Sequence, residues 1–253
     1  MFAEQAPSAP SAETRPPGEA PPGNELLVVD GVTKLFGPLR ALDEVSLRVN
    51  SGEVLGLVGP NGSGKTTVIN VISGLLEPTS GEVRLDGQRV SGLAPHRLAR
   101  KGINRTFQIP KPFPELTVSE NLKVAVHASR LADAEILELV GLGGNAERLA
   151  SELTASDQKR LDLARALVTG PRLLLVDELG AGLSKSELDE LAAILRRLVS
   201  ELGVTLLVVE HLLGFLEQVT DKVTVLNAGA IIFSGVLSEA LADPTVIKVF
   251  IGE

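Results

Sequence analysis

The sequence predicts an α/β fold in which helices flank a mostly parallel sheet, with an antiparallel β-subdomain at the N-terminal end. Two near-continuous apolar runs, at 172–178 and 204–210, are typical of parallel strands that are covered on both faces. Strand-like and helical segments alternate along most of the chain, and this alternation favours an α/β core. Short apolar or alternating runs between residues 25 and 50 indicate instead the strands of an antiparallel sheet.

Each expected strand is a short run of apolar or alternating residues. These runs cover residues 25–36, 40–50, 53–59, 82–90, 172–178, 204–210, 221–229 and 230–235. Breaks are expected at Gly31, Gly37 and Gly52, and the run at 82–90 is expected to form a hairpin around the Asp86–Gly87 turn. The expected helices have apolar residues at helical spacing and cover residues 66–76, 131–142, 158–168, 188–199 and 211–219.

Composition and charge exclude several classes of protein. The formal net charge of −8 weighs against a non-specific nucleic-acid binder, which would present a basic face. The chain has no cysteine, so it forms no disulfide and no thiolate metal site, as fits a reducing compartment. No apolar run approaches the ~18 residues that a membrane span needs. Residues 1–24 are rich in proline and alanine and are expected to be a disordered tail, followed by one domain over 25–253.

The segment GPNGSGKTT matches the phosphate-binding pattern G-x-x-x-x-G-K-[ST] and lies between an expected strand and an expected helix. Its glycines let backbone N–H groups turn inward around a phosphate chain. The lysine can reach the outer phosphates, and the hydroxyl of Thr66 can bind Mg²⁺. The residues expected to bind phosphate are Gly59, Pro60, Asn61, Gly62, Ser63, Gly64, Lys65, Thr66 and Thr67. The alternative is a flexible Gly/Ser turn, but the strand-to-helix context favours a P-loop NTPase core.

Two acidic residues end the buried run at 172–178. Asp177 is placed to hold Mg²⁺ through water, and Glu178 could polarise an attacking water. The alternative is that the two acids only terminate a strand. A P-loop occurs in kinases, GTPases, helicases and transport ATPases, so these residues do not by themselves name a function.

With these residues, the chain resembles the ATP-binding subunits of ABC transporters over nearly all of 25–253. It looks most like the subunits of branched-chain amino acid importers, to which the runs RTFQ, PELTV and ENL and the ending DPTVIKVFIGE point. The resemblance implies that Phe36 stacks on adenine and that Gln108 joins the metal site to the groove for a membrane subunit. It also implies that His211 contacts the terminal phosphate. Each has an alternative: a core aromatic, a loop residue and a structural histidine, respectively.

The segment LTASDQKRLDLARAL, residues 153–167, matches the family's signature segment, which touches the nucleotide bound to a partner subunit. The resemblance places it at the end of a short helical subdomain over about 109–157 and implies nucleotide contacts for Thr154 and Ser156. Both glycines of the Leu-Ser-Gly-Gly-Gln consensus are absent. Thr154 and Asp157 approximate a capping box, so this segment also starts a helix. The side chains at 155 and 156 are expected to hinder phosphate approach, so glycine at both positions should raise ATPase activity.

Further departures from the family lie around this segment. Leu179 stands where proline is usual, and Ser184 stands where many members have aspartate. The region between Asn121 and Ser151 is shorter than the helical subdomain usually is.

The resemblance implies partners and a mechanism. Two ATP-binding subunits, identical or related, would sandwich two ATP molecules with Mg²⁺ at the cytoplasmic side of the cell membrane. The motion on hydrolysis would pass to integral membrane permease subunits, with a solute-binding protein as an indirect partner and no nucleic acid bound.

Four alternatives to this function stay open. A kinase or GTPase is disfavoured because the signature segment is not needed there and no Asn-Lys-x-Asp sequence is present. A soluble ABC ATPase acting on nucleic acid or ribosomes would usually carry two ATPase units or a coiled-coil insertion. The third alternative is a subunit of a lipid or urea transporter, and the fourth is a binding-only regulatory subunit with a degenerate signature.

Overall fold

The computed structural model describes residues 24–106, 112–125, 128–220 and 222–251. The strands are β1 Glu25–Phe36, β2 Leu39–Asn50, β3 Val54–Val58, β4 Ser80–Leu85, β5 Gln88–Arg89, β6 Ile103–Arg105, β7 Leu173–Asp177, β8 Thr205–Val209, β9 Lys222–Asn227 and β10 Ala230–Val236. The α-helices are α1 Lys65–Ile72, α2 Pro95–Arg100, α3 Val118–Lys123, α4 Asp133–Leu139, α5 Ala155–Leu167, α6 Lys185–Leu202, α7 Leu213–Val219, α8 Leu237–Ala240 and α9 Pro244–Ile251. Two short 3₁₀ helices cover Gly143–Asn145 and Ala150–Glu152.

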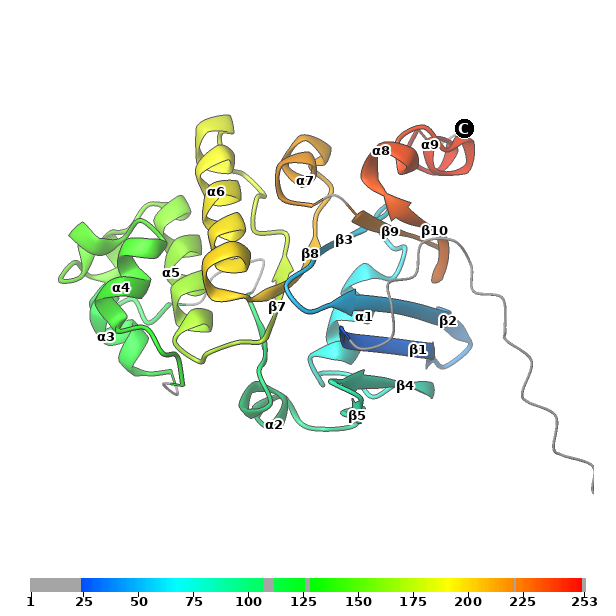
Figure 1. The fold of residues 1–253 in the computed structure, drawn as a ribbon, viewed down its shortest axis with the longest axis horizontal. Helices are drawn as coiled ribbons and strands as arrows, with labels where there is room; N and C mark the ends of the chain where they lie inside the picture. Colours follow the sequence, from blue (N-terminus) through cyan, green and yellow to red (C-terminus); the bar gives the residue numbers. More distant parts are fainter. Residues whose placement is uncertain (1–23, 107–111, 126–127, 221, 252–253) are drawn as a thin grey trace, which may run out of the picture.

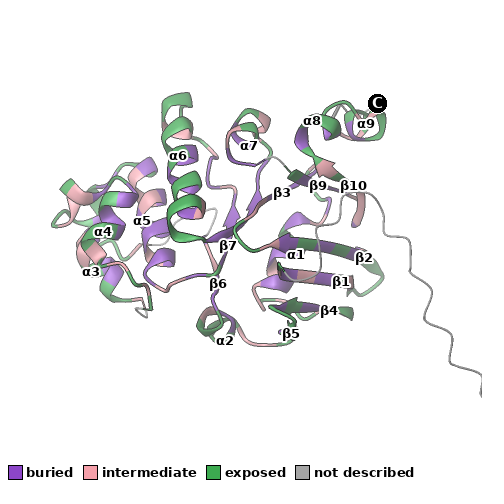
Figure 2. Cartoon of the chain, in the orientation of Figure 1, coloured by how far each residue is buried: buried purple, intermediate pink, exposed green. Residues whose placement is uncertain are grey.

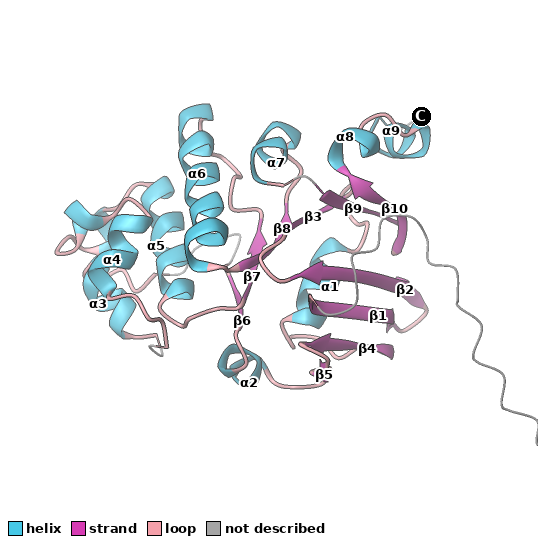
Figure 3. Cartoon of the chain, in the orientation of Figure 1, coloured by secondary structure: helices cyan, strands magenta, loops and turns pink. Residues whose placement is uncertain are grey.

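Two sheets form the centre of the fold, as the sequence predicts for its α/β class. The larger sheet has the strand order β10-β9-β3-β8-β7-β6, in which all neighbours are parallel except the β9–β10 pair. The smaller sheet has the order β2-β1-β4-β5 and is antiparallel throughout. In Figures 1 and 3, α3, α4 and α5 gather on one side of β7, and the antiparallel sheet lies on the other side.

Strands β7 and β8 show why the sheet is covered on both faces. All ten residues of the two strands are buried. Alternate residues belong to two different hydrophobic cores: Leu174 and Leu206 pack with the helices α4 to α7, and Leu175 and Leu207 pack with α1 and the antiparallel sheet. Figure 2 shows these central strands as buried, while exposed residues line the outer side of α6.

Local sequence explains how helix α6 begins and ends and how β4 joins β5. Helix α6 starts with a complete capping box, in which Ser184 and Glu187 each bond the other's backbone N–H, and it ends at Gly203 with φ of 66°. The Asp86–Gly87 turn joins β4 to β5 as predicted, with φ of 52° and 71°, which is typical of a type I′ hairpin turn.

Two expectations about the elements were wrong, and one strand was not expected. The helix predicted over 66–76 ends at Ile72, because Gly74 adopts φ of 73° and the chain turns back there. Gly31 does not break β1, which continues through it with a shift in register. Strand β6 has only three residues and was not predicted, because its pairing with β7 is a long-range contact that local periodicity does not reveal.

Within the described residues, none of the helices combines the length and the apolar composition that a membrane span requires.

Candidate nucleotide site

The candidate site is built on the carboxyl ends of three neighbouring parallel strands. Strand β3 leads into the loop that starts α1, β7 leads into Glu178, and β8 leads into Glu210 and His211. Because β7, β8 and β3 are adjacent and parallel, these three ends lie along one edge of the sheet. Ligands of open α/β sheets bind at this edge, outside the carboxyl ends of the strands.

The 59–67 loop wraps around its own lysine. The amine of Lys65 donates hydrogen bonds to the carbonyl oxygens of Gly59, at 2.8 Å, and Pro60, at 3.0 Å. Lys65 is buried, and this burial lowers its pKa, while the negative charges of Glu178 and Asp177 raise it. The lysine is thus held in the loop by two carbonyls, near enough to Glu178 and Asp177 for their charges to act on it.

Two glycines of this loop lie where a side chain would not fit. A Cβ at Gly59, which has φ of 147°, would lie 2.1 Å from the carbonyl oxygen of Leu226. A Cβ at Gly64, which has φ of 109°, would lie 2.9 Å from the carbonyl oxygen of Ala41. Gly64 is also the N-cap of α1 and gives it no side-chain cap, so the first N–H groups of this helix are available to an anion.

The other loop residues differ in exposure. Asn61, Gly62 and Thr66 are exposed, and Thr67 is half-buried. The Ser63 side chain is buried, and its hydroxyl makes no hydrogen bond to the described residues.

Asp177 is held by an arginine that sequence reasoning did not single out. The guanidinium of Arg105, at the end of β6, lies 2.6 Å from Asp177 Oδ2, and its other terminal nitrogen donates to Asn70 Oδ1 at 2.7 Å. Both partners of the ion pair are almost fully buried, with side-chain exposures of 11% and 9%. The pair fixes the carboxylate at the end of β7.

Glu178 lies close to His211, which follows β8. Its carboxylate is 3.9 Å from His211 Nδ1, and the two side chains are 20% and 51% exposed, respectively. Such exposure is not that of a core histidine. The backbone of Glu178 adopts φ of 47°, in the left-handed region that residues other than glycine rarely occupy, and its N–H donates to the Val209 carbonyl.

The signature segment lies away from the P-loop of the same chain. Helix α5 starts at Ala155 after Thr154, whose hydroxyl accepts a hydrogen bond from Asp157 N at 3.1 Å. In Figure 1, α5 and α1 lie on opposite sides of β7. Thr154 is exposed and Ser156 is buried, so the structure does not bring Ser156 to the surface as a phosphate contact.

Of the remaining predicted site residues, Phe36 ends β1 and Gln108 lies outside the described residues. Phe36 is 45% exposed, with the amine of Lys34 at 5.2 Å from its ring centre, so it is not a core aromatic.

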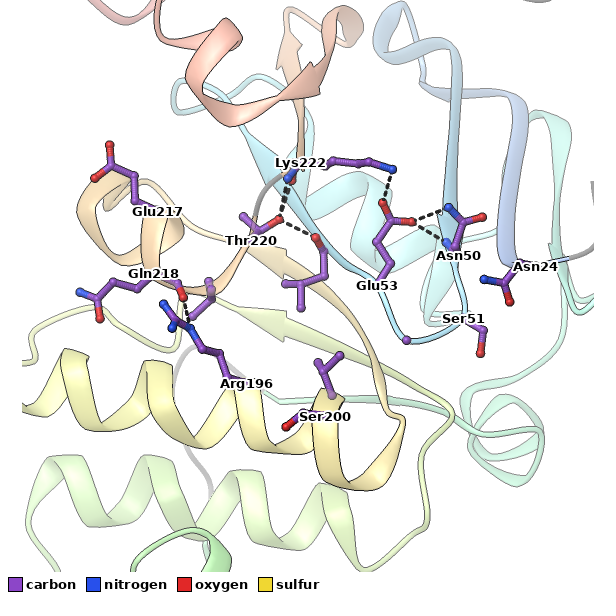
Figure 4. A pocket seen from close by; sticks show the side chains of 14 residues that line it. Asn24, Asn50, Ser51, Glu53, Arg196, Ser200, Glu217, Gln218, Thr220 and Lys222 are labelled. Carbon is purple, nitrogen blue, oxygen red and sulfur yellow. Dashed lines mark hydrogen bonds and ion pairs between the residues drawn. The ribbon is translucent and has the colours of Figure 1, made fainter. Parts of the chain in front are cut away.

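A hollow of about 870 Å³ lies at the opposite edge of the larger sheet, where β3 and β9 begin (Figure 4). Two of its charged groups form an ion pair, Glu53 with Lys222 at 3.0 Å, and Glu53 also accepts hydrogen bonds from the N and Nδ2 of Asn50, both at 2.8 Å. Arg196 donates to the backbone carbonyl of Gln218. Because it lies at the edge of the sheet opposite to the P-loop, this hollow is not the candidate nucleotide site.

Comparisons with known proteins agree with this geometry. The family model described as ABC transporter matches residues 42–181. The high-affinity branched-chain amino acid transport ATP-binding protein BraF of Pseudomonas aeruginosa is 39% identical over 250 residues, which cover 90% of this chain and 98% of BraF.

Solved structures give the same result. A nucleotide-free ATP-binding cassette from an ABC transporter superposes with a TM-score of 0.83 at 33% identity, covering 90% of this chain and 100% of that chain. The dimeric post-hydrolysis state of the cassette MJ0796, bound to ADP and phosphate, gives a TM-score of 0.73 at 27% identity, covering 84% of this chain and 99% of that chain. Together with the P-loop and the acids that follow β7, these matches establish that the chain belongs to the ABC transporter family, as an ATP-binding and ATP-hydrolysing subunit.

Proposed function

We propose that this subunit energises an importer of branched-chain amino acids. The observation that carries the proposal is the match to BraF, which extends over 90% of this chain and 98% of BraF. An ATP-binding subunit does not touch the transported solute, so support for the solute comes from this likeness and not from the site.

We propose that the bound nucleotide is ATP with Mg²⁺. The oxygen donors Thr66 and Asp177 fit this ion, which proteins usually bind through one or two carboxylates together with substrate phosphates and water. The described residues contain no group of three or more acidic, histidine or cysteine side chains that could hold a metal alone, and this suits a metal that arrives with phosphates. When bound, Mg²⁺ would neutralise charge on the phosphates. The role of Gln108 as a further ligand is also part of the proposal.

In the proposed hydrolysis, each residue of the site has one task. Lys65 exchanges its bonds with the loop carbonyls for bonds with the outer phosphates, while residues 61–67 offer backbone N–H groups to them. Glu178 orients the attacking water, and His211 holds the terminal phosphate; their separation of 3.9 Å supports joint action. Phe36 stacks on the adenine, and the exposure of its ring supports this role.

We further propose that hydrolysis takes place between two such subunits. Within one chain the signature segment and the P-loop lie on opposite sides of β7, so Thr154 would serve the nucleotide of a partner. The related cassette MJ0796 is dimeric in its post-hydrolysis state, which supports the same arrangement. Gln108 and the segment 109–114 would pass the motion to integral membrane permeases at the cytoplasmic side of the membrane. A solute-binding protein would be an indirect partner, which acts through the permeases.

The substitution Glu178→Gln tests the chemistry. It keeps the shape of the side chain but removes the base, so ATP hydrolysis should fall at least about a hundredfold while ATP binding stays intact. A closed dimer should accumulate with ATP, as seen by size-exclusion chromatography. The exposed Glu201→Gln serves as the control. A Glu178→Gln variant as active as the wild type would remove Glu178 from its role.

Uptake of labelled leucine, isoleucine and valine tests the solute. The full chain, purified with its membrane subunits and a solute-binding protein in proteoliposomes, should transport these amino acids at the expense of ATP. Transport of urea or a lipid in their place would contradict the proposal.

A further inference from the structure

Two buried side chains hold the backbone that directly follows Glu178. The amine of Lys159, on α5, donates hydrogen bonds to the carbonyl oxygens of Leu179, at 2.7 Å, and of Ala181. The carboxylate of Glu210, at the end of β8, accepts a hydrogen bond from the N–H of Gly180 at 2.7 Å. Three consecutive residues, called here the 179–181 segment, are therefore each bound through a backbone polar group.

The burial of these two charged groups needs a reason. Lys159 is 8% exposed and Glu210 is 0% exposed. Burial lowers the pKa of Lys159 and raises that of Glu210, and in each case a nearby opposite charge acts against the shift. Backbone hydrogen bonds from Gly180 and His211 also act against the raised pKa of Glu210. Charged groups are rarely buried without a partner, and here the partner is mainly the 179–181 backbone.

Gly180 allows the segment to come this close. A Cβ at this position would lie 2.9 Å from Leu188 Cδ2 and 3.1 Å from Glu210 Oε1. The absence of a side chain at 180 thus lets the backbone N–H reach the carboxylate.

The conformation of Glu178 requires support from its surroundings. Its φ of 47° is strained for a residue with a side chain, and such a conformation persists only where neighbouring contacts hold it. Position 179 is leucine, so no proline ring restrains the backbone after Glu178. The bonds to the 179–181 segment supply restraint at this point.

We propose that Lys159 and Glu210 are positioning residues for ATP hydrolysis, which hold the 179–181 segment so that Glu178 keeps its place beside His211. The inference rests on the proposed role of Glu178 and deepens it. Because Lys159 belongs to the helix that begins after Thr154, it ties the signature segment of one nucleotide site to the catalytic carboxylate of the other. A displacement of α5 when a partner docks would thus move Glu178.

Lys159→Met and Glu210→Leu test the proposal, since each removes the hydrogen-bonding group and keeps much of the side-chain volume. Each should lower kcat of the full chain about tenfold or more, because misplacing a catalytic group slows the chemical step. KM and the affinity for a non-hydrolysable ATP analogue should stay within about twofold, because neither residue belongs to the P-loop. Glu210→Gln, which keeps an oxygen for the Gly180 N–H, should retain most of the rate. Lys101→Met and Glu201→Gln, at exposed positions, are the matched controls.

A double-mutant cycle separates positioning from general damage. In the Glu178→Gln background no catalytic carboxylate remains to be positioned, so adding Lys159→Met should lower the residual rate by less than about twofold. A full tenfold loss in that background would overturn the proposal. If Lys159→Met does not fold, the variants Glu210→Leu and Glu210→Gln test the proposal in its place. A kcat of Glu210→Leu equal to that of the wild type would overturn the proposal.

The proposed role of Glu178 and the positioning role of Lys159 and Glu210 can be refuted separately. Full activity of Glu178→Gln would refute the proposed function, and the positioning role with it. An inactive Glu178→Gln together with fully active, folded Lys159→Met and Glu210→Leu would refute the positioning role alone.

Discussion

The residues that replace the two signature glycines differ in where their side chains lie. Ala155 is exposed, whereas Ser156 is buried beside α6. The hydroxyl and N–H of Ser184 and, less strongly, the hydroxyl of Ser156 bond Glu187 and lower the pKa of its carboxyl. The sequence-based hypothesis treated both side chains as obstacles to a phosphate, but in the structure only the one at 155 is exposed to an approaching ligand.

Ala155→Gly should therefore raise ATPase activity of the assembled complex, and Ser156→Gly should not. Removing the exposed methyl lets a phosphate approach the start of α5 more closely, for an expected gain of roughly fivefold, or about 1 kcal/mol of barrier. Steady-state phosphate release by both variants checks this. No change or a fall for Ala155→Gly, or an equal gain for Ser156→Gly, would count against the idea.

At the scale of single elements, the caps distinguish α5 from its neighbours. Helices α3 and α6 have complete capping boxes, at Thr117 with Glu120 and at Ser184 with Glu187. In α5 only the bond from Asp157 N to the Thr154 hydroxyl is present, and the structure gives no return bond between these two residues. Aspartate is one methylene shorter than the glutamate of a capping box, so the expected box is only half formed.

The remaining cap of α5 should nevertheless be measurable. Thr154→Ala removes the acceptor for Asp157 N and should lower the free energy of unfolding by about 1 kcal/mol without nucleotide, while Thr154→Ser should keep it. Urea denaturation followed by circular dichroism measures both, with an unchanged midpoint for Thr154→Ala as the contradicting result. The expected loss in the free energy of unfolding is that of one helix cap, and it should be the same whether or not a partner chain is present.

At the scale of the whole molecule, the proposed mechanism gives one chain the halves of two different nucleotide sites. The P-loop and the acids after β7 and β8 occupy one edge of the larger sheet, and the signature segment belongs to the helices on the other side of β7 (Figure 1). On the proposed mechanism, binding of ATP and pairing of subunits are linked, so the active species depends on protein concentration.

The rate of hydrolysis per chain should therefore fall on dilution. Well below the dissociation constant of the dimer, a tenfold dilution should lower the rate per chain about tenfold, because the dimeric fraction falls in proportion. Phosphate release across a dilution series, with molar mass from light scattering, tests this. A constant rate per chain in a preparation that is monomeric throughout would contradict the two-chain site.

Local patterns in the sequence were sufficient for most elements around the P-loop. Residues 59–67 follow a buried strand and start a helix, and the acids Asp177 and Glu178 end another buried strand, as expected. These features depend on short-range properties: apolar runs, glycines and the order of elements. The end of α1 was missed because Gly74, and not apolar periodicity, terminates it.

From neighbouring residues alone the sequence predicted the α/β class, the phosphate loop and the position of Glu178 after a buried strand, whereas the role of His211 was implied by the resemblance to a family. Only the tertiary structure decided which side chains support them. Arg105 bonds a carboxylate 72 positions away, Lys159 bonds a carbonyl 20 positions away, and Glu210 bonds an N–H 30 positions away. No local period relates such partners, since parallel strands and a packed helix bring them together only after the chain has folded.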